Sequence, residues 1–272
     1  MKPSIRGWFA LILMSGMLSA EAEDTSDPYA GPKPVIVWIQ TSPWASVIGA
    51  DSPRLAIYED GTVIRQDVRN GDESNFRQSR LPPERLGQIL GAIRSLGDFS
   101  VVRRHYNLAP SISDAPKTRF YLDLDGQPLI STVEGLVAGH APRRAVSPLF
   151  RGPHPAEPPE VLLALHEYLQ GLRFDDESDW VPDYIEVIVW PYDHAPDTSI
   201  RWPPNWPGLD SPQTIRLRDG YSIFLKGAQI ANLEAFLATR KPKGAVEIAH
   251  RKFAVSWRPV FPRQRTWEIS RH

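Results

Sequence analysis

The 272-residue sequence contains no cysteine. This absence excludes disulfides, thiolate metal ligands and cysteine nucleophiles. The chain also has no excess of either charge, since Lys plus Arg is 31, Asp plus Glu is 32 and the net charge is −1. A chain without a basic excess has no overall field that attracts nucleic acid. We therefore expect no nucleic-acid partner.

The composition is that of a folded protein with short elements. Hydrophobic residues make up 42% of the chain and aromatic residues 10%, which is enough to build a core. There are 27 prolines against 18 glycines, and frequent proline interrupts helices and favours rigid turns. These proportions disfavour a long helical bundle and favour a mixed α+β fold.

The first 22 residues have the features of a secretory signal peptide. Lys2 and Arg6 form a basic start, residues 7–18 are apolar, and Ala20-Glu21-Ala22 has the small-x-small pattern of a cleavage site. The apolar run is too short to cross a hydrocarbon core comfortably, and no later stretch is apolar enough to do so. The sequence therefore predicts cleavage after Ala22, export to the periplasm or beyond, and no transmembrane segment afterwards.

The remaining chain divides by composition and periodicity into four parts. Residues 23–33 are polar and aperiodic, and predict a flexible linker. Residues 34–136 predict a first α+β unit, and residues 137–181 a long crossing loop followed by a connecting helix. Residues 182–272 predict a second α+β unit.

An internal duplication is indicated by the tetrapeptide Val-Ile-Val-Trp, which occurs at 35–38 and again at 187–190. Each copy is followed by a hairpin turning at Asp-Gly (60–61 and 219–220), then by a helix and a second hairpin. The repeat predicts two similar lobes, each a mostly antiparallel sheet with one helix across it. The two tetrapeptides should then occupy equivalent strands of superposable lobes.

The Asp-Gly turns also predict which side chains share a face. A two-residue type I′ turn at 60–61 would place Leu55, Ile57, Ile64 and Gln66 together. In the second copy the period of two yields two further sets, one containing Ile215, Leu217 and Phe224 and the other Arg216, Tyr221 and Ile223.

Three helices are predicted by apolar residues spaced three or four apart. The first is opened by Pro82-Pro83 and closed by Gly97. The second spans residues near 230–237, and the third, at 158–171, connects the two units.

The ten residues 55–64 read Leu-x-Ile-Tyr-x-Asp-Gly-Thr-Val-Ile. Together with the helix ending at 96–99, Tyr106 and the turn at 125–126, this pattern resembles uncharacterised secreted bacterial proteins. The resemblance covers residues 53–136 and implies a bacterial source, but no activity. Related-looking families often have a cysteine before the first hairpin, which this chain lacks.

No common catalytic or metal-binding motif is present. The sequence has no His-x-His, no His-Glu-x-x-His, no Gly-x-Ser-x-Gly and no phosphate loop. Ser113, Asp114 and His140 are available for a dispersed triad, as such residues are in any long chain. His166, on the edge of a helix stripe, and His250, in a turn, are interpreted as ordinary partly exposed histidines. We therefore predict no catalytic residue, metal or cofactor.

The most unusual segment has two Trp-Pro steps four residues apart. Trp202 and Trp206 can stack on sugars or on proline-rich peptide, while Arg201 and Asn205 supply polar contacts. These four residues are the candidate ligand-binding site. The alternative is that the prolines pin both indoles over the end of a sheet. We expect Trp206 to be the more buried and Trp202 to be the exposed contact.

Charge is unevenly distributed along the chain. Residues 156–198 contain eleven acidic residues against one basic, a net of −10, and residues 240–272 contain nine basic against two acidic, a net of +7. Either the two stretches lie close together and their charges neutralise each other, or the basic stretch binds a polyanion of the cell surface.

Taken together, these features favour an exported, non-catalytic protein that binds a protein or polymer of the bacterial envelope. The alternative is a hydrolase of envelope polymers with a dispersed carboxylate or histidine site.

Overall fold

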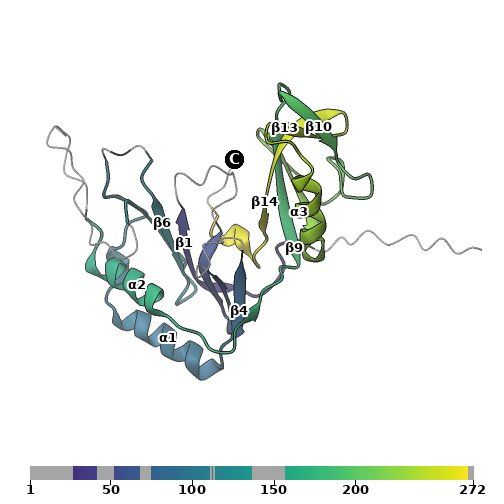
Figure 1. Cartoon of the computed structure of the whole chain (residues 1–272). Coiled ribbons are helices and arrows are strands. Elements are labelled where there is room, and N and C mark those ends of the chain that lie inside the picture. Colours follow the sequence, from purple (N-terminus) through teal and green to yellow (C-terminus); the bar gives the residue numbers. More distant parts are fainter. Residues whose placement is uncertain are drawn as a thin grey trace, which may run out of the picture.

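A computed structural model describes residues 27–41, 52–67, 75–110, 112, 114–136 and 157–268. The chain has a mixed α+β fold with two sheets, one of eight strands and one of six (Figure 1). This confirms the predicted fold class. The predicted signal peptide, Ser113, His140 and most of the crossing loop lie outside the described residues. Among the helices of the described part, none is long and apolar enough to span a bilayer.

The first sheet has the strand order β5-β7-β6-β1-β2-β3-β4-β8, and we call it, with its helices, the first lobe. In chain order its strands are β1 (Pro34–Thr41), β2 (Pro53–Tyr58), β3 (Thr62–Gln66), β4 (Phe76–Arg80), β5 (His105–Asn107), β6 (Lys117–Leu122), β7 (Leu129–Glu134) and β8 (Ser178–Asp179). Helices α1 (Pro83–Ser95) and α2 (Glu160–Gly171) lie along one of its faces (Figure 1).

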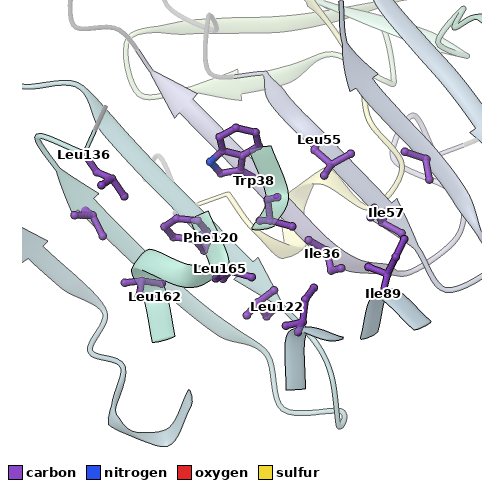
Figure 2. Close-up of a cluster of buried hydrophobic side chains, with 14 of the residues drawn as sticks. Ile36, Trp38, Leu55, Ile57, Ile89, Phe120, Leu122, Leu136, Leu162 and Leu165 are labelled. Carbon is purple, nitrogen blue, oxygen red and sulfur yellow. The ribbon is translucent and has the colours of Figure 1, made fainter. Parts of the chain in front are cut away.

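The main core of the first lobe lies between this face and the two helices. Ile89 and Ile93 of α1 are almost fully buried, as are Leu162 and Leu165 of α2. They pack against the apolar side chains of the central strands, among them Phe120 (Figure 2). Both helices therefore occur where apolar spacing and Pro-Pro starts predict them.

The second sheet has the order β10-β13-β14-β9-β12-β11, and forms the second lobe with helix α3 (Ile230–Ala238). Leu233 of α3 is fully buried in the core beside this sheet. The strands are β9 (Tyr184–Pro191), β10 (Asp197–Arg201), β11 (Ile215–Leu217), β12 (Gly220–Lys226), β13 (Gly244–Ile248) and β14 (Arg251–Pro259).

The two Val-Ile-Val-Trp segments lie in β1 and β9, each with an antiparallel neighbour on both sides. The hairpins beside β1 and β9, however, pair with these strands differently. Strand β1 pairs with the first strand of each hairpin (β2 and β6), whereas β9 pairs with the second (β12 and β14). The expectation of superposable lobes is therefore wrong. The reason is that either strand of a hairpin can pair with a central strand, and periodicity does not distinguish the two.

The first hairpin also differs from its prediction. Ile57 pairs with Val63, so the loop has three residues, 59–61, and only Gly61 has a positive φ, of 86°. The predicted two-residue type I′ turn is therefore wrong. A shift of one residue moves a strand's side chains to the opposite face. Ile64 and Gln66 consequently face away from Leu55 and Ile57.

The hairpin of β11 and β12 has the predicted faces, because Ile215 pairs with Ser222 and Arg216 with Tyr221. Its two turn residues are Arg218 and Asp219, neither with a positive φ, so type I′ is wrong here too. Gly220 is the first residue of β12. A Cβ at this position would lie 2.0 Å from the carbonyl oxygen of Val189, so glycine is required for close backbone approach.

A segment near each end of the described chain packs between the two sheets. Phe261 and Trp267 cover the face of the first sheet opposite the helices. Tyr29 packs edge-to-face on Phe224 of the second sheet, and its carbonyl accepts a hydrogen bond from the Arg263 amide at 2.8 Å. Tyr29, which belongs to the predicted flexible linker of residues 23–33, is therefore packed, and the tail of the second unit completes the first lobe.

A buried charge network links the second sheet to this C-terminal segment. Arg258 of β14 lies opposite Glu186 of β9 and donates to it at 2.6 Å, and Ser222 donates to the same carboxylate at 2.6 Å. Arg258 also lies 2.6 Å from Glu268. The acidic and basic stretches thus meet here, although Glu177 and Asp179 pair with arginines of the first lobe instead.

Candidate functional site

A row of paired residues crosses the helix-covered face of the first sheet. Trp38 pairs with Leu55, Leu55 with Arg65, and Arg65 with Arg77. Directly paired residues of neighbouring strands point to the same face. The row therefore begins with apolar side chains near α2 and becomes basic toward β4.

A cavity of about 720 Å³ lies where α2 ends and the following chain runs beside this row. It is large enough for a small molecule, since ligand pockets commonly measure about 300–1,000 Å³. Its walls come from β1, β2, β3, the last turn of α2 and the segment after it. The lining residues are Trp38, Gln40, Arg54, Leu55, Arg65, Gln66, Leu169, Gln170, Leu172, Arg173, Phe174 and Glu177.

The apolar part of the wall contains a polar group without a partner. Trp38 is 8% exposed, and its indole N–H is buried with no hydrogen-bond partner among the described residues. Figure 2 shows the ring between Leu55 and Phe120, above the core. A buried donor left unpaired costs free energy, so such groups in native proteins call for an explanation.

The polar part of the wall is dominated by arginine. Arg65 is held by Glu177 through two guanidinium nitrogens, a bidentate ion pair. Arg173 donates to the carbonyl oxygens of Gln170 at 3.0 Å and Leu172 at 2.8 Å, close to the end of α2. With Arg54, the lining residues that the structure describes include three guanidinium groups and one carboxylate.

His166 lies one helical turn before the cavity-lining Gln170. It is 5% exposed, so the expectation of a partly exposed histidine is wrong. Its ring packs edge-to-face on Trp38 and Phe120, and its Nε2 lies 2.6 Å from the Gln170 amide nitrogen. Burial lowers the pKa of His166 from 6.5 to about 4. The neutral ring is therefore part of the core.

This pKa predicts that stability falls at mildly acidic pH. The unfolded chain takes up a proton on His166 below pH 6.5, whereas the folded protein resists protonation until about pH 4. The stabilisation is thus present in full above pH 6.5 and is lost progressively toward pH 4, by at most about 3 kcal/mol. We expect urea unfolding at pH 7.5 and 4.5 to show a smaller difference in His166→Phe than in the wild type.

The matched control for this experiment is His250→Gln, because the His250 side chain is 98% exposed. That variant should keep the wild-type pH dependence. If His166→Phe also keeps the full pH dependence of stability, the buried neutral histidine is not the source of that dependence.

The structure places the four predicted ligand-binding residues in a loop of the second lobe. Trp202 is 8% exposed and donates its indole N–H to the Pro207 carbonyl at 3.0 Å, whereas Trp206 is only half-buried. The two rings pack edge-to-face with centroids 5.0 Å apart. The expected order of burial is therefore reversed.

The reason lies in the backbone. The Trp202 amide donates to the Glu247 carbonyl at 2.9 Å and so extends the pairing of β10 with β13. Both indoles then meet Phe236 of α3 and belong to the core of the second lobe. Arg201 and Asn205 are exposed and make no described contact with either indole. A hollow of about 300 Å³ beside the loop is lined in part by Trp202 and Trp206. Ligand binding by these four residues stays a prediction.

No cluster of three or more His, Asp or Glu that could hold a metal ion occurs among the described residues. Comparisons with protein-family models, curated proteins and solved structures found no match for this chain. The function has to be inferred from the chain's own geometry.

Local sequence patterns do not predict the arginine-lined cavity. Its residues are spread over three strands, the end of α2 and the segment that follows α2. The available signal was Arg173-Phe174 directly after an apolar helix, which adds a charged and an aromatic side chain where the helix stops covering the sheet.

Proposed function

We propose that this protein is an exported, non-catalytic binding protein of the bacterial envelope, and that it holds a small molecule in the cavity at the end of α2. The observation that supports this proposal is a 720 Å³ cavity with an apolar wall and a polar rim, built on paired strands. Known ligand sites share this combination, in which apolar side chains bury the ligand and a few polar groups orient it.

The lining favours binding over the alternative of hydrolysis. Glycoside cleavage uses two carboxyl groups that flank the scissile bond. In the described part of the cavity lining there is one carboxylate, Glu177, which is engaged by Arg65, and there is no histidine, serine or threonine. These side chains can hold and orient a molecule, but they provide no paired acid and base.

A neutral solvatochromic dye such as Nile red tests whether the cavity binds. We expect saturable, one-to-one binding to the wild type. Gln40→Trp should weaken it by about tenfold or more, because the half-buried Gln40 lines the cavity and an indole would fill it. Thr198→Trp, at an exposed position on β10 of the second lobe, is the control and should bind as the wild type does.

Two outcomes would count against the proposal. One is the absence of saturable binding to the wild type. The other is equal affinity of the wild type and Gln40→Trp for Nile red, provided that Gln40→Trp and Thr198→Trp both unfold with the cooperative melt of the wild type.

Export is tested separately from binding. We expect the protein isolated from the envelope fraction of its native host to begin at Glu23, or at Glu21 if cleavage follows Ala20. N-terminal sequencing that finds intact Met1 there would contradict this part of the proposal.

A further inference from the structure

The charge of the cavity restricts the chemistry of its ligand. Among the described residues of the lining are three guanidinium groups and one carboxylate, Glu177, which is engaged by Arg65. The neighbouring acids Asp175 and Asp176 are exposed and do not belong to the lining. The lining is therefore basic, although the chain as a whole has a net charge of −1.

Arg173 retains donors for a ligand. A guanidinium has five N–H groups in a planar fork that matches carboxylate and phosphate oxygens. The described contacts of Arg173 use one nitrogen, Nη1, which donates to the two backbone carbonyls at the end of α2. These bonds orient the side chain at the rim, so less conformational entropy is lost when an anion binds.

The opposite wall is apolar. Trp38 and Leu55 are buried on the sheet, Leu169 is buried on α2, and Phe174 is half-buried in the following segment. A fully polar ligand would leave this wall without contacts. An apolar body next to the anionic group would instead remove the wall from water, at about 25 cal/mol for each Å² of apolar surface buried.

We propose that the ligand is an amphipathic anion. Its carboxylate or phosphate head binds at Arg54 and Arg173, and its apolar body lies against Trp38, Leu55 and Phe174. This inference rests on the proposed function, since it assigns a ligand class to the same cavity.

Isothermal titration with four probes below their micelle concentrations tests the assignment. The probes are dodecanoate, dodecyl phosphate, dodecanol and dodecyltrimethylammonium, which share one chain and differ in the head. We expect both anions to bind at least about tenfold more tightly than the alcohol or the cation. Dodecanoate and dodecyl phosphate also distinguish a fatty-acid ligand from a phospholipid-like one.

Charge-removing variants locate the head. Arg54→Gln combined with Arg173→Gln should weaken anion binding by about tenfold and dodecanol binding much less, because the alcohol head forms no ion pair and the apolar wall is retained. Arg201→Gln makes the same change at an exposed arginine of the second lobe and should have no effect. Anion binding to the wild type should also weaken as salt is raised.

The outcomes separate the two proposals. If Nile red binds and Gln40→Trp blocks it, but anions and cations bind equally well, the amphipathic-anion inference is wrong and the binding function stands. Anion binding that is unchanged in the double arginine variant also overturns the inference. If Nile red binds but none of the four dodecyl probes does, the inference is wrong; if Nile red does not bind either, the binding function itself is wrong.

Discussion

Replacing Trp267 with alanine should lower the free energy of unfolding by about 3–5 kcal/mol, the usual cost of truncating a buried large aromatic side chain. Trp267 is 1% exposed and packs against the face of the first sheet that the helices leave uncovered, with its ring 6.4 Å from that of Tyr121. Removal of the indole would open a cavity between this sheet and the C-terminal segment. Urea unfolding at neutral pH measures the loss.

Two further variants show whether burial is the cause. Trp267→Phe should lose less free energy of unfolding than Trp267→Ala, because the phenyl ring fills part of the space left by the indole. Trp190→Ala, at a half-buried position on β9, should lose less than Trp267→Ala. Hydrogen exchange then locates the damage, since Trp267→Ala should reduce protection in β1, β2 and β6. A variant with wild-type stability would show that the C-terminal segment is not part of the first lobe's core.

Gly61→Val should be similarly severe, for two reasons that act together. Gly61 has a φ of 86°, which a β-branched residue resists. A Cβ at this position would also lie 2.4 Å from the Leu81 carbonyl oxygen, so the backbone of two segments would have to separate. We expect a loss of more than about 3 kcal/mol in urea unfolding, from left-handed strain of about 1–2 kcal/mol and the displaced Leu81 backbone.

The chain offers a matched control for this variant. Gly126 has nearly the same φ, 77°, but nothing lies within 4 Å of the position of its Cβ. Gly126→Val should therefore lose only the part due to backbone strain. Equal losses in Gly61→Val and Gly126→Val would show that the contact with Leu81 contributes nothing.

Local features of the fold were predictable from the sequence because local spacing determines them. Helix α1 begins after Pro82 and ends before Gly97, and α3 and α2 occur where apolar residues recur at helical intervals. Strands β1 and β9 follow from short β-branched runs. These features need only neighbours within about ten residues, and periodicity measures such neighbours directly.

The arrangement of the strands was less predictable, because the alternation of apolar and polar residues specifies neither the length of a hairpin loop nor the strand with which a hairpin pairs. A loop of three residues rather than two in the first hairpin reverses the facing of Arg65 and Gln66. With the predicted turn, Arg65 would point away from Leu55. The actual register places it beside Leu55 in the covered row, where it lines the cavity.

The candidate binding site could not be predicted for the same reason, together with the distances along the chain. Trp38 and Arg173 lie 135 positions apart, and they line one cavity only because α2 stops short of the basic end of the row. The Trp-Pro loop was conspicuous in composition, but the pairing of β10 with β13 assigns Trp202 to the core.

The position of residues 260–268 has a consequence for the order in which the molecule acquires its structure. These residues are near the end of the chain, yet they cover one face of a sheet whose first strand begins at Pro34. Along the chain, the strands and helices of the first lobe precede the whole second sheet, whereas the second cover of the first lobe follows that sheet. Until Phe261 and Trp267 arrive, that face remains an open apolar surface, suited to chaperone capture and vulnerable to aggregation or proteolysis. A chain truncated before Phe261 is therefore expected to lose stability in the first lobe, although it retains the strands and helices of that lobe.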